Sequence, residues 1–255
     1  MLPRFLAESV NVEQATARLS EDETRHLGQV LRLSAGDEIA VFDGAGREFR
    51  ARVERVAREG ADVTLLEEAV PAPEPAVRVT LAQAVLKGEK MDDVVRDATM
   101  MGVAVIEPLV TGHTVAHLKE GRAPERWRRI AIASAKQCRR AVVPGIGAGT
   151  SFPDWVARDR SALKILLTEP SAAEKRGLSP FSKRGQVQLK RGQSPFLPPA
   201  SATLLVGPEG GWTDEEVESA IARGYVPLTL GQRTLRADAV PVVAIGVLQF
   251  MWMDL

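Results

Sequence analysis

The chain has little of the material from which disulfides and metal centres are built. Its 255 residues include one cysteine, Cys138, and three histidines. A lone cysteine excludes an internal disulfide, and so few cysteines and histidines leave little for a zinc site. His113 and His117 lie four residues apart without the H-E-x-x-H pattern of a zinc-binding helix, so we expect no bound metal. Cys138 has no neighbouring pattern that would make it a nucleophile.

Net charge and long apolar runs are also missing. Lys plus Arg and Asp plus Glu each number 33, so no overall field draws the chain to nucleic acid, and RNA binding would need local patches. The apolar stretch from Val240 to Met253 is too short for the ~20 residues that cross a bilayer, and we expect a buried helix there, at a subunit interface. Arg4 and Glu8 interrupt the N-terminal segment, which does not fit a secretory signal, so we expect a cytoplasmic protein.

Prolines at alternate positions of residues 71–76 predict a linker between two domains, because they favour an extended chain. Before the linker, short alternating apolar runs flank the turn residues 43–46, a pattern typical of a β-hairpin in a small barrel. We therefore expect a β-barrel domain over residues 1–70 and a second domain over residues 77–255.

After the linker, strand patterns alternate with helix patterns. Apolar residues recur at helical spacing over residues 91–101, and Gly102 then ends the run. Apolar runs typical of buried strands lie at residues 77–84, 103–110, 163–167 and 203–206. This alternation predicts a mostly parallel sheet with helices on both faces.

One segment, residues 171–199, interrupts the alternation. The sequence RGLSPF at 176–181 recurs as RGQSPF at 191–196, and no periodic apolar face accompanies it. Its six basic residues suit contact with RNA, but composition alone favours a tolerated insertion. We expect an inserted flexible surface loop.

A glycine-rich loop joins a strand to a helix at residues 206–213, which read VGPEGGWT. Thr213 and Glu216 form a capping box that predicts a helix through Ala222. Glycines let a backbone approach a ligand, and free N–H groups at a helix start favour a negative ligand group. Because neither nucleotide-binding fingerprint is present, an ordinary tight turn is the alternative.

A second glycine-containing loop leads into the apolar terminal helix at residues 230–241, which read LGQRTLRADAVP. Asp238 is the expected N-cap, and Pro241 is tolerated in the first helical turn. In a parallel sheet both glycine loops emerge at the same edge, where ligands of open α/β folds bind.

The segment from Lys119 to Arg140 is strongly basic, with eight basic residues and two acidic ones. A helical stretch of this charge can neutralise RNA phosphates. An ordinary solvated helix face is the alternative.

The loop pair GPEGG and LGxRxLRA, followed by an apolar terminal helix, resembles the RsmE family of SPOUT methyltransferases, which modify N3 of a uridine in bacterial 16S ribosomal RNA. The likeness covers most of the chain except the insertion, and it extends to Arg25-His26, Val30-Leu31-Arg32, residues 86–92, Gln137, Arg140 and Pro144. The chain departs from the family pattern at residues 100–103, 136–140 and 238–240, which leaves details of RNA contact and the target position open.

The resemblance implies an α/β fold in which a small N-terminal PUA-like β-barrel, for RNA, precedes a trefoil-knotted SPOUT methyltransferase domain. It implies S-adenosylmethionine as cofactor, 16S ribosomal RNA or the small ribosomal subunit as partner, and a homodimer.

The resemblance also implies the site residues. Arg236 is the expected catalytic cation, and Glu209 is a second catalytic candidate, as an orienting group or proton acceptor, unless its carboxylate only stabilises the loop. The expected cofactor-binding residues are Leu167, Thr168, Glu169, Val206, Gly207, Pro208, Gly210, Gly211, Leu230, Gly231 and Leu235. The expected RNA-binding residues are Arg25, His26, Arg32, Lys87, Lys90 and Arg140, although His26 fits a structural histidine equally well.

Two other functions stay open at this point. One is a non-catalytic RNA-binding or ribosome-assembly protein with the same fold, and the other is a knotted methyltransferase with another RNA target. Titration with S-adenosylmethionine separates the first from an enzyme, because a pure binder does not need the cofactor.

Overall fold

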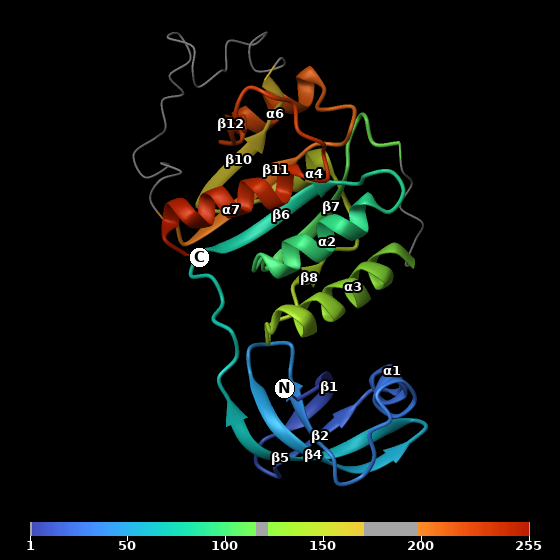
Figure 1. The fold of residues 1–255 in the computed structure, drawn as a ribbon. Coiled ribbons are helices and arrows are strands. Elements are labelled where there is room, and N and C mark those ends of the chain that lie inside the picture. Colours follow the sequence, from blue (N-terminus) through green and yellow to red (C-terminus); the bar gives the residue numbers. More distant parts are fainter. Residues whose placement is uncertain (1, 116–121, 171–197, 255) are drawn as a thin grey trace. The chain divides into compact units, whose positions relative to one another are not determined.

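The computed structural model describes residues 2–115, 122–170 and 198–254. Contacts divide the chain into two compact units (Figure 1): unit 1 comprises Met1–Glu74 with Ile132–Val143, and unit 2 comprises Pro75–Ala131 with Pro144–Leu255. His117 and the expected insertion up to residue 197 lie outside the described residues. No helix in the described ranges is long and apolar enough to cross a membrane.

Unit 1 is a closed β-barrel, as the alternating apolar pattern predicts. Its strand order is β1-β2-β5-β4-β3, and every pair is antiparallel except β1 with β3. Phe49, Ala51 and Val53 of β4 are buried while the residues between them are exposed, so the period of two places one face in the core. The strands are β1 (Arg4–Asn11), β2 (Thr16–Leu19), β3 (Glu38–Phe42), β4 (Glu48–Ala57) and β5 (Gly60–Ala69).

The predicted hairpin at residues 43–46 is confirmed, because β3 and β4 pair on either side of it. The Asp43 carboxylate accepts hydrogen bonds from the N–H groups of Ala45 (2.7 Å) and Arg47 (3.0 Å), which fixes the turn. After β2, the chain forms α1 (Glu21–Arg25) and then one π-helical turn, η1 (His26–Val30).

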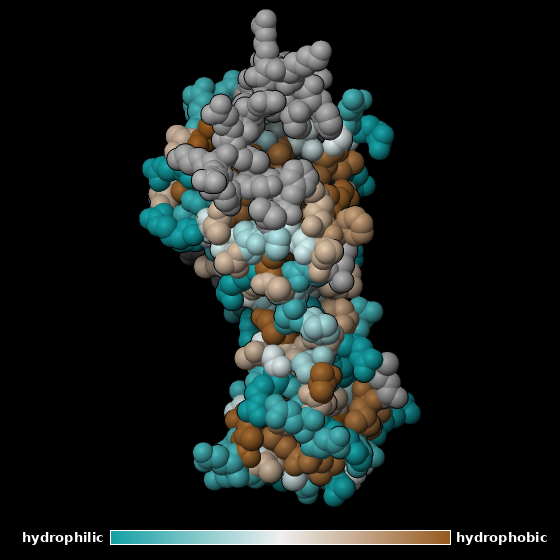
Figure 2. Space-filling model, turned by 90° about the vertical axis from the view of Figure 1, so that its left-hand side faces the viewer, coloured by the Kyte–Doolittle hydropathy of each residue, from teal (hydrophilic) through white to brown (hydrophobic). Residues whose placement is uncertain are grey.

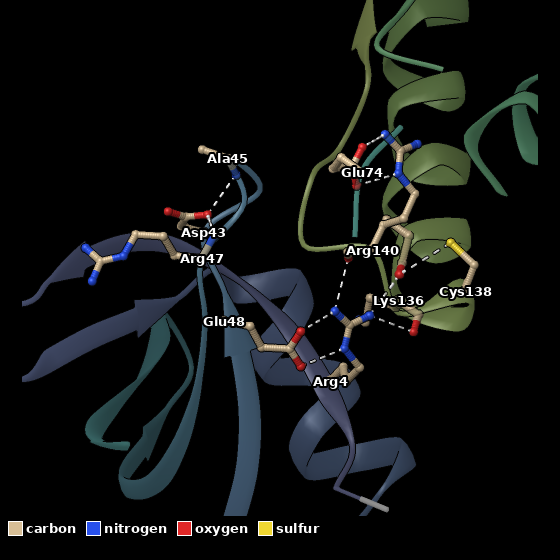
Figure 3. Close-up of polar contacts among 10 residues, drawn as sticks. Arg4, Asp43, Ala45, Arg47, Glu48, Glu74, Lys136, Cys138 and Arg140 are labelled. Carbon is tan, nitrogen blue, oxygen red and sulfur yellow. Dashed lines mark hydrogen bonds and ion pairs between the residues drawn. The ribbon is translucent and has the colours of Figure 1, made fainter. Parts of the chain in front are cut away.

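A buried ionic network joins the barrel strands to the end of α3 (Arg122–Cys138) within unit 1 (Figure 3). The guanidinium of Arg4 forms two hydrogen bonds to Glu48, at 2.8 and 3.0 Å, and three to the carbonyl oxygens of Ala135, Lys136 and Arg140. Arg4 therefore satisfies carbonyl groups at the end of α3 that have no partner inside the helix. No sequence pattern pointed to this network or to the grouping of Ile132–Val143 with the barrel.

Unit 2 is built on an all-parallel sheet in the order β12-β10-β11-β6-β7-β8, with β9 paired to β7. The strands are β6 (Arg78–Ala84), β7 (Val105–Val110), β8 (Gly145–Ile146), β9 (Thr150–Ser151), β10 (Leu163–Leu167), β11 (Ser201–Val206) and β12 (Val226–Leu228). Alternate residues of these strands face opposite sides, so both faces need a helical cover.

Helices cover both faces of this sheet, as predicted (Figure 1). One face packs through Ala82, Leu166 and Leu205 against α4 (Phe152–Arg158) and α6 (Asp214–Ala222). The other carries α2 (Lys90–Met100) and α7 (Val240–Trp252). Gly102 ends α2 with a φ of +83°, a conformation that glycine adopts without strain.

The terminal helix α7 corrects one prediction. Its N-cap is Ala239, not Asp238, and the carboxylate of Asp238 instead binds Arg236. Within the single chain the helix is buried on one face, and its expected place at a subunit interface stays a prediction. Val243, Val247 and Phe250, at spacings of four and three, are 40%, 46% and 75% exposed.

Candidate functional site

A cavity of about 440 Å³ lies where three parallel strands of unit 2 end. The strands β10, β11 and β12 end at Leu167, Val206 and Leu228, and the segments that follow them meet at one edge of the sheet. Ligands of open α/β folds bind at such an edge, and the volume suits a small molecule. The walls consist of Lys90 and of residues 167–170, 206–212, 230, 233–237 and 240.

The first glycine loop has the conformation that its glycines permit. Gly211 has a φ of +68°, and its N–H donates to the Pro208 carbonyl oxygen at 3.0 Å, which closes a tight turn. Trp212 packs beside Gly207, where an added Cβ would lie 3.1 Å from the indole ring. The indole N–H donates to the Leu167 carbonyl oxygen at 2.9 Å, so Trp212 ties this loop to the end of β10.

The second glycine loop is held at both of its ends. The N–H of Thr168 donates to the Leu228 carbonyl oxygen at 2.9 Å, where β12 ends. The Arg236 carbonyl oxygen accepts from the N–H groups of Ala239 and Val240, at 2.9 and 3.1 Å, just before α7. Leu230 and Leu235 add apolar wall to the cavity between these two anchors.

Glu209 is paired in the cavity wall. Its Oε1 accepts from Lys90 Nζ at 2.8 Å and from the Lys87 N–H at 3.3 Å. Burial raises the pKa of Glu209, but the hydrogen bonds from Lys90 and from backbone N–H groups outweigh burial and hold that pKa below its ordinary value. The carboxylate is therefore ionised and bound at neutral pH.

Arg236 lies at the open side of the same cavity. Its Nε and Nη2 donate to the two carboxylate oxygens of Asp238 at 3.1 and 2.8 Å, and its side chain is 74% exposed. Burial raises the pKa of Asp238, but the hydrogen bond and charge of Arg236 prevail and lower it below the ordinary value. The guanidinium is thus held in one orientation while much of it stays accessible.

The cavity collects nearly all of the residues expected to bind the cofactor. Of that set only Gly231, with a φ of +77°, is outside the lining, and both catalytic candidates lie in it. The sequence analysis missed Pro170, Trp212, Arg233, Thr234, Ala237 and Val240, although most of them belong to the two loops that it identified. The individual roles of these residues stay predictions.

The expected RNA-binding residues are divided between the two units. Arg25 pairs with Asp22 at 3.0 Å, and His26 stacks at a tilt on Phe5 with ring centroids 6.0 Å apart. Arg32 is exposed in the left-handed conformation at a φ of +58°. In unit 2, Lys90 lines the cavity and Lys87 is exposed.

Arg140 has a structural partner. Its side chain is 5% exposed and forms a bidentate ion pair with Glu74, at 2.9 and 2.5 Å (Figure 3). Contact with RNA would have to open this pair, so an RNA-binding role for Arg140 stays a prediction. Among the described residues, no group of three or more His, Cys, Asp or Glu is arranged to hold a metal ion.

Comparison with known proteins gives two family matches. Residues 73–249 match the RNA methyltransferase domain, and residues 19–66 match the RNA methyltransferase PUA domain. The ribosomal RNA small subunit methyltransferase E of Synechocystis sp. is 32% identical over 246 residues, which cover 96% of this chain and 77% of that protein. The protein of that name from Bacillus subtilis is 26% identical, with 93% and 91% coverage.

Solved structures agree with the sequence relatives. The ribosomal RNA small subunit methyltransferase E from Neisseria gonorrhoeae, bound to S-adenosyl methionine, is 27% identical, with a TM-score of 0.82 over 99% of this chain and 98% of that one. The expected fold class, a knotted SPOUT methyltransferase domain with a PUA-like barrel, is confirmed. The chain belongs to the RNA methyltransferase family of ribosomal RNA small subunit methyltransferase E.

Proposed function

We propose that the protein transfers a methyl group from S-adenosylmethionine to N3 of a uridine in 16S ribosomal RNA. The cavity at the ends of β10, β11 and β12 carries this proposal, because both of its principal loops contain the motifs of the family. The names of the relatives and the S-adenosyl methionine bound to the Neisseria structure support it.

The lining of the cavity fits this cofactor. Leu167, Val206 and Leu230 provide apolar wall for a flat base. Among the described residues, a Cβ on Gly211 would have one neighbour within 4 Å, the carboxylate of Glu169 at 3.9 Å, so the glycine keeps the space beside that carboxylate open. Carboxylate oxygens accept hydrogen bonds from ribose hydroxyls or face a cation, and the cofactor has both groups.

The protein must align the two reactants and assist loss of the N3 proton. When bound, S-adenosylmethionine supplies a methyl group that its sulfonium already activates. Alignment alone lowers the barrier by up to ~7–11 kcal/mol in intramolecular reactions. The N3 proton passes to solvent water, its loss places negative charge on the uracil carbonyl oxygens, and we assign Arg236 to stabilise that charge.

The geometry supports a different task for Glu209. A carboxylate that is paired with Lys90 and has a lowered pKa is a weak base at neutral pH. We propose that Glu209 orients the glycine loop through Lys90 and the Lys87 N–H.

We further propose that the protein is a homodimer that uses α7. Figure 2 shows apolar surface on unit 2. Val243, Val247 and Phe250 of α7 are apolar residues with exposed side chains. Met253, which follows the helix, is 85% exposed and extends this apolar surface. Surfaces of this kind mark protein interfaces.

Nucleoside mapping tests the methyltransferase proposal. Ribosomal RNA from cells with and without the protein is digested and analysed by mass spectrometry, and the purified protein is titrated calorimetrically with S-adenosylmethionine. We expect N3-methyluridine to be lost from 16S RNA in cells without the protein. An unchanged modification pattern without cofactor binding would instead indicate a ribosome-assembly protein, and loss of another methylated nucleoside would indicate another RNA target.

A further inference from the structure

A short turn after β7 is rigid through its own side chains. The hydroxyls of Thr111 and Thr114 lie 2.8 Å apart, and the Thr111 N–H donates to the Thr114 hydroxyl at 3.0 Å. The Thr114 N–H donates in turn to the Thr111 carbonyl oxygen at 3.1 Å. Residues 111–114 therefore form a closed turn, to which neither the sequence analysis nor the proposed function assigns a role.

This turn forms one hydrogen bond to α6 and one to the first glycine loop. The Gly112 N–H donates at 2.8 Å to Glu216, the carboxylate that also accepts from the Thr213 N–H in the capping box of α6. Nδ1 of His113 lies 3.2 Å from the carbonyl oxygen of Gly211. One contact thus fixes the start of α6, and the other fixes the glycine next to the cavity.

The imidazole also packs on the loop. A Cβ on Gly210 would lie 3.0 Å from the Cβ and 3.4 Å from the Cγ of His113, which is tighter than ordinary van der Waals contact. Gly210 is therefore a glycine because the histidine occupies that space. The side of the loop that faces His113 is filled, so the loop cannot relax in that direction.

The contact with Gly211 assigns the hydrogen on the imidazole. A carbonyl oxygen can only accept, so Nδ1 must carry the hydrogen. Nδ1 of His113 is therefore the donor in this contact, and the Gly211 carbonyl oxygen is the acceptor.

We propose that His113 is a positioning residue that holds the Gly210–Gly211 segment in the conformation that binds the cofactor. The proposal rests on the proposed function only in taking S-adenosylmethionine as the ligand. A loop that is ordered before binding loses less conformational freedom when the ligand arrives, which increases affinity. Removing the imidazole should weaken cofactor affinity about tenfold, the equivalent of one ordinary hydrogen bond.

Three substitutions of His113 distinguish the contributions of its two ring nitrogens. In His113→Asn the amide N–H₂ can occupy the place of Nδ1, whereas in His113→Gln it reaches the place of Nε2. His113→Ala removes both, and Val115→Ala, at a 63% exposed position two residues further on, is the matched control. The first readout is the Kd for S-adenosylmethionine by calorimetry, and the second is hydrogen exchange of the amides of residues 207–213 without cofactor.

The expected pattern is specific to Nδ1. The Ala and Gln variants should bind about tenfold more weakly and exchange faster at residues 207–213, whereas the Asn variant and the Val115 control should match the parent. The turnover number at saturating cofactor should change little, and its pH profile should keep its shape.

Each contrary result has a separate meaning. Equal exchange and affinity in the Ala variant and the parent would overturn the proposal, as would rescue by Gln but not by Asn. If the parent bound no S-adenosylmethionine, the proposed function would fail, and the exchange data alone would still decide whether His113 holds the loop.

Discussion

Replacement of Arg236 by alanine tests the central assignment of the proposed mechanism. The side chain is 74% exposed, and its guanidinium forms an ion pair with Asp238. An exposed pair of this kind contributes ~0–1 kcal/mol to the free energy of unfolding. The variant should therefore fold almost as stably as the parent, so a loss of activity would report on chemistry.

The expected loss of rate is much larger than the loss of stability. Removal of one donor aimed at negative charge that develops in the transition state costs on the order of 3 kcal/mol, or 10²–10³ in rate. Because that charge is absent before N3 loses its proton, the affinity for S-adenosylmethionine should fall far less. Arg236→Lys should restore only part of the rate, since one ammonium group cannot reproduce the planar fork that holds Asp238.

The assay is single-turnover methylation at saturating S-adenosylmethionine, beside a calorimetric cofactor titration of the same protein. Arg233→Ala is the matched control, because Arg233 lines the same cavity on the same loop. A full rate in the Arg236→Ala variant would show that Arg236 is not the catalytic residue. Equal losses of rate and cofactor affinity would make Arg236 a residue of the binding loop. Equal effects of the Arg233 and Arg236 substitutions would indicate that the positive charge of the loop matters and not one guanidinium.

Four further outcomes are expected. Arg4→Ala should lower the free energy of unfolding of unit 1 by about 3–5 kcal/mol in chemical denaturation, because it leaves the buried carboxylate of Glu48 unpaired. A change below about 1 kcal/mol would contradict a stabilising role of the network. Gly211→Val should abolish calorimetric binding of S-adenosylmethionine while the barrel stays folded, because valine strains at a φ of +68°; undiminished binding would remove Gly211 from the site. Folding lowers the pKa of Glu209, so its carboxylate stabilises the loop at neutral pH, and this stabilisation is lost as the pH falls below the ordinary value of 4.5. The affinity for S-adenosylmethionine, measured across that pH range, should fall with it. An unchanged affinity would show that the carboxylate is dispensable. Phe250→Glu should give a monomer in light scattering, since it places a charge on the exposed face of α7, and an unchanged mass would refute this interface.

The local elements of unit 2 could be predicted from the sequence because each has a short-range cause. The capping box of Thr213 and Glu216 is present as expected, and the spacing of apolar residues gave α2 and its end at Gly102. Parallel strands bring their carboxyl ends to one edge, so two loops distant in sequence could be placed together before any coordinates existed.

The failures come from side-chain partners that the local sequence patterns do not reveal. Asp238 was expected to cap α7, but Arg236 two residues earlier competes for the same carboxylate and binds it in bidentate fashion. Arg4 and Arg140 meet their partners across large separations in sequence, and nothing near either residue marks it as buried. Arg140 shows the consequence: the family resemblance and the basic segment suggested RNA contact, which stays a prediction, and neither indicated that its guanidinium is buried against Glu74.

The charges around the cavity bear on how one site can serve a cofactor that carries a sulfonium cation and an RNA that is a polyanion. Lys90 is paired with Glu209 and Arg236 with Asp238, so a neighbouring carboxylate neutralises each of these two cations. A zwitterionic cofactor with a sulfonium cation is then selected by shape, backbone groups and apolar contact, and salt should weaken its binding little. RNA has to be attracted by cations elsewhere on the surface, where salt weakens the interaction strongly. We assign Arg236 to link the two demands, because Asp238 holds its guanidinium and its side chain is still 74% exposed.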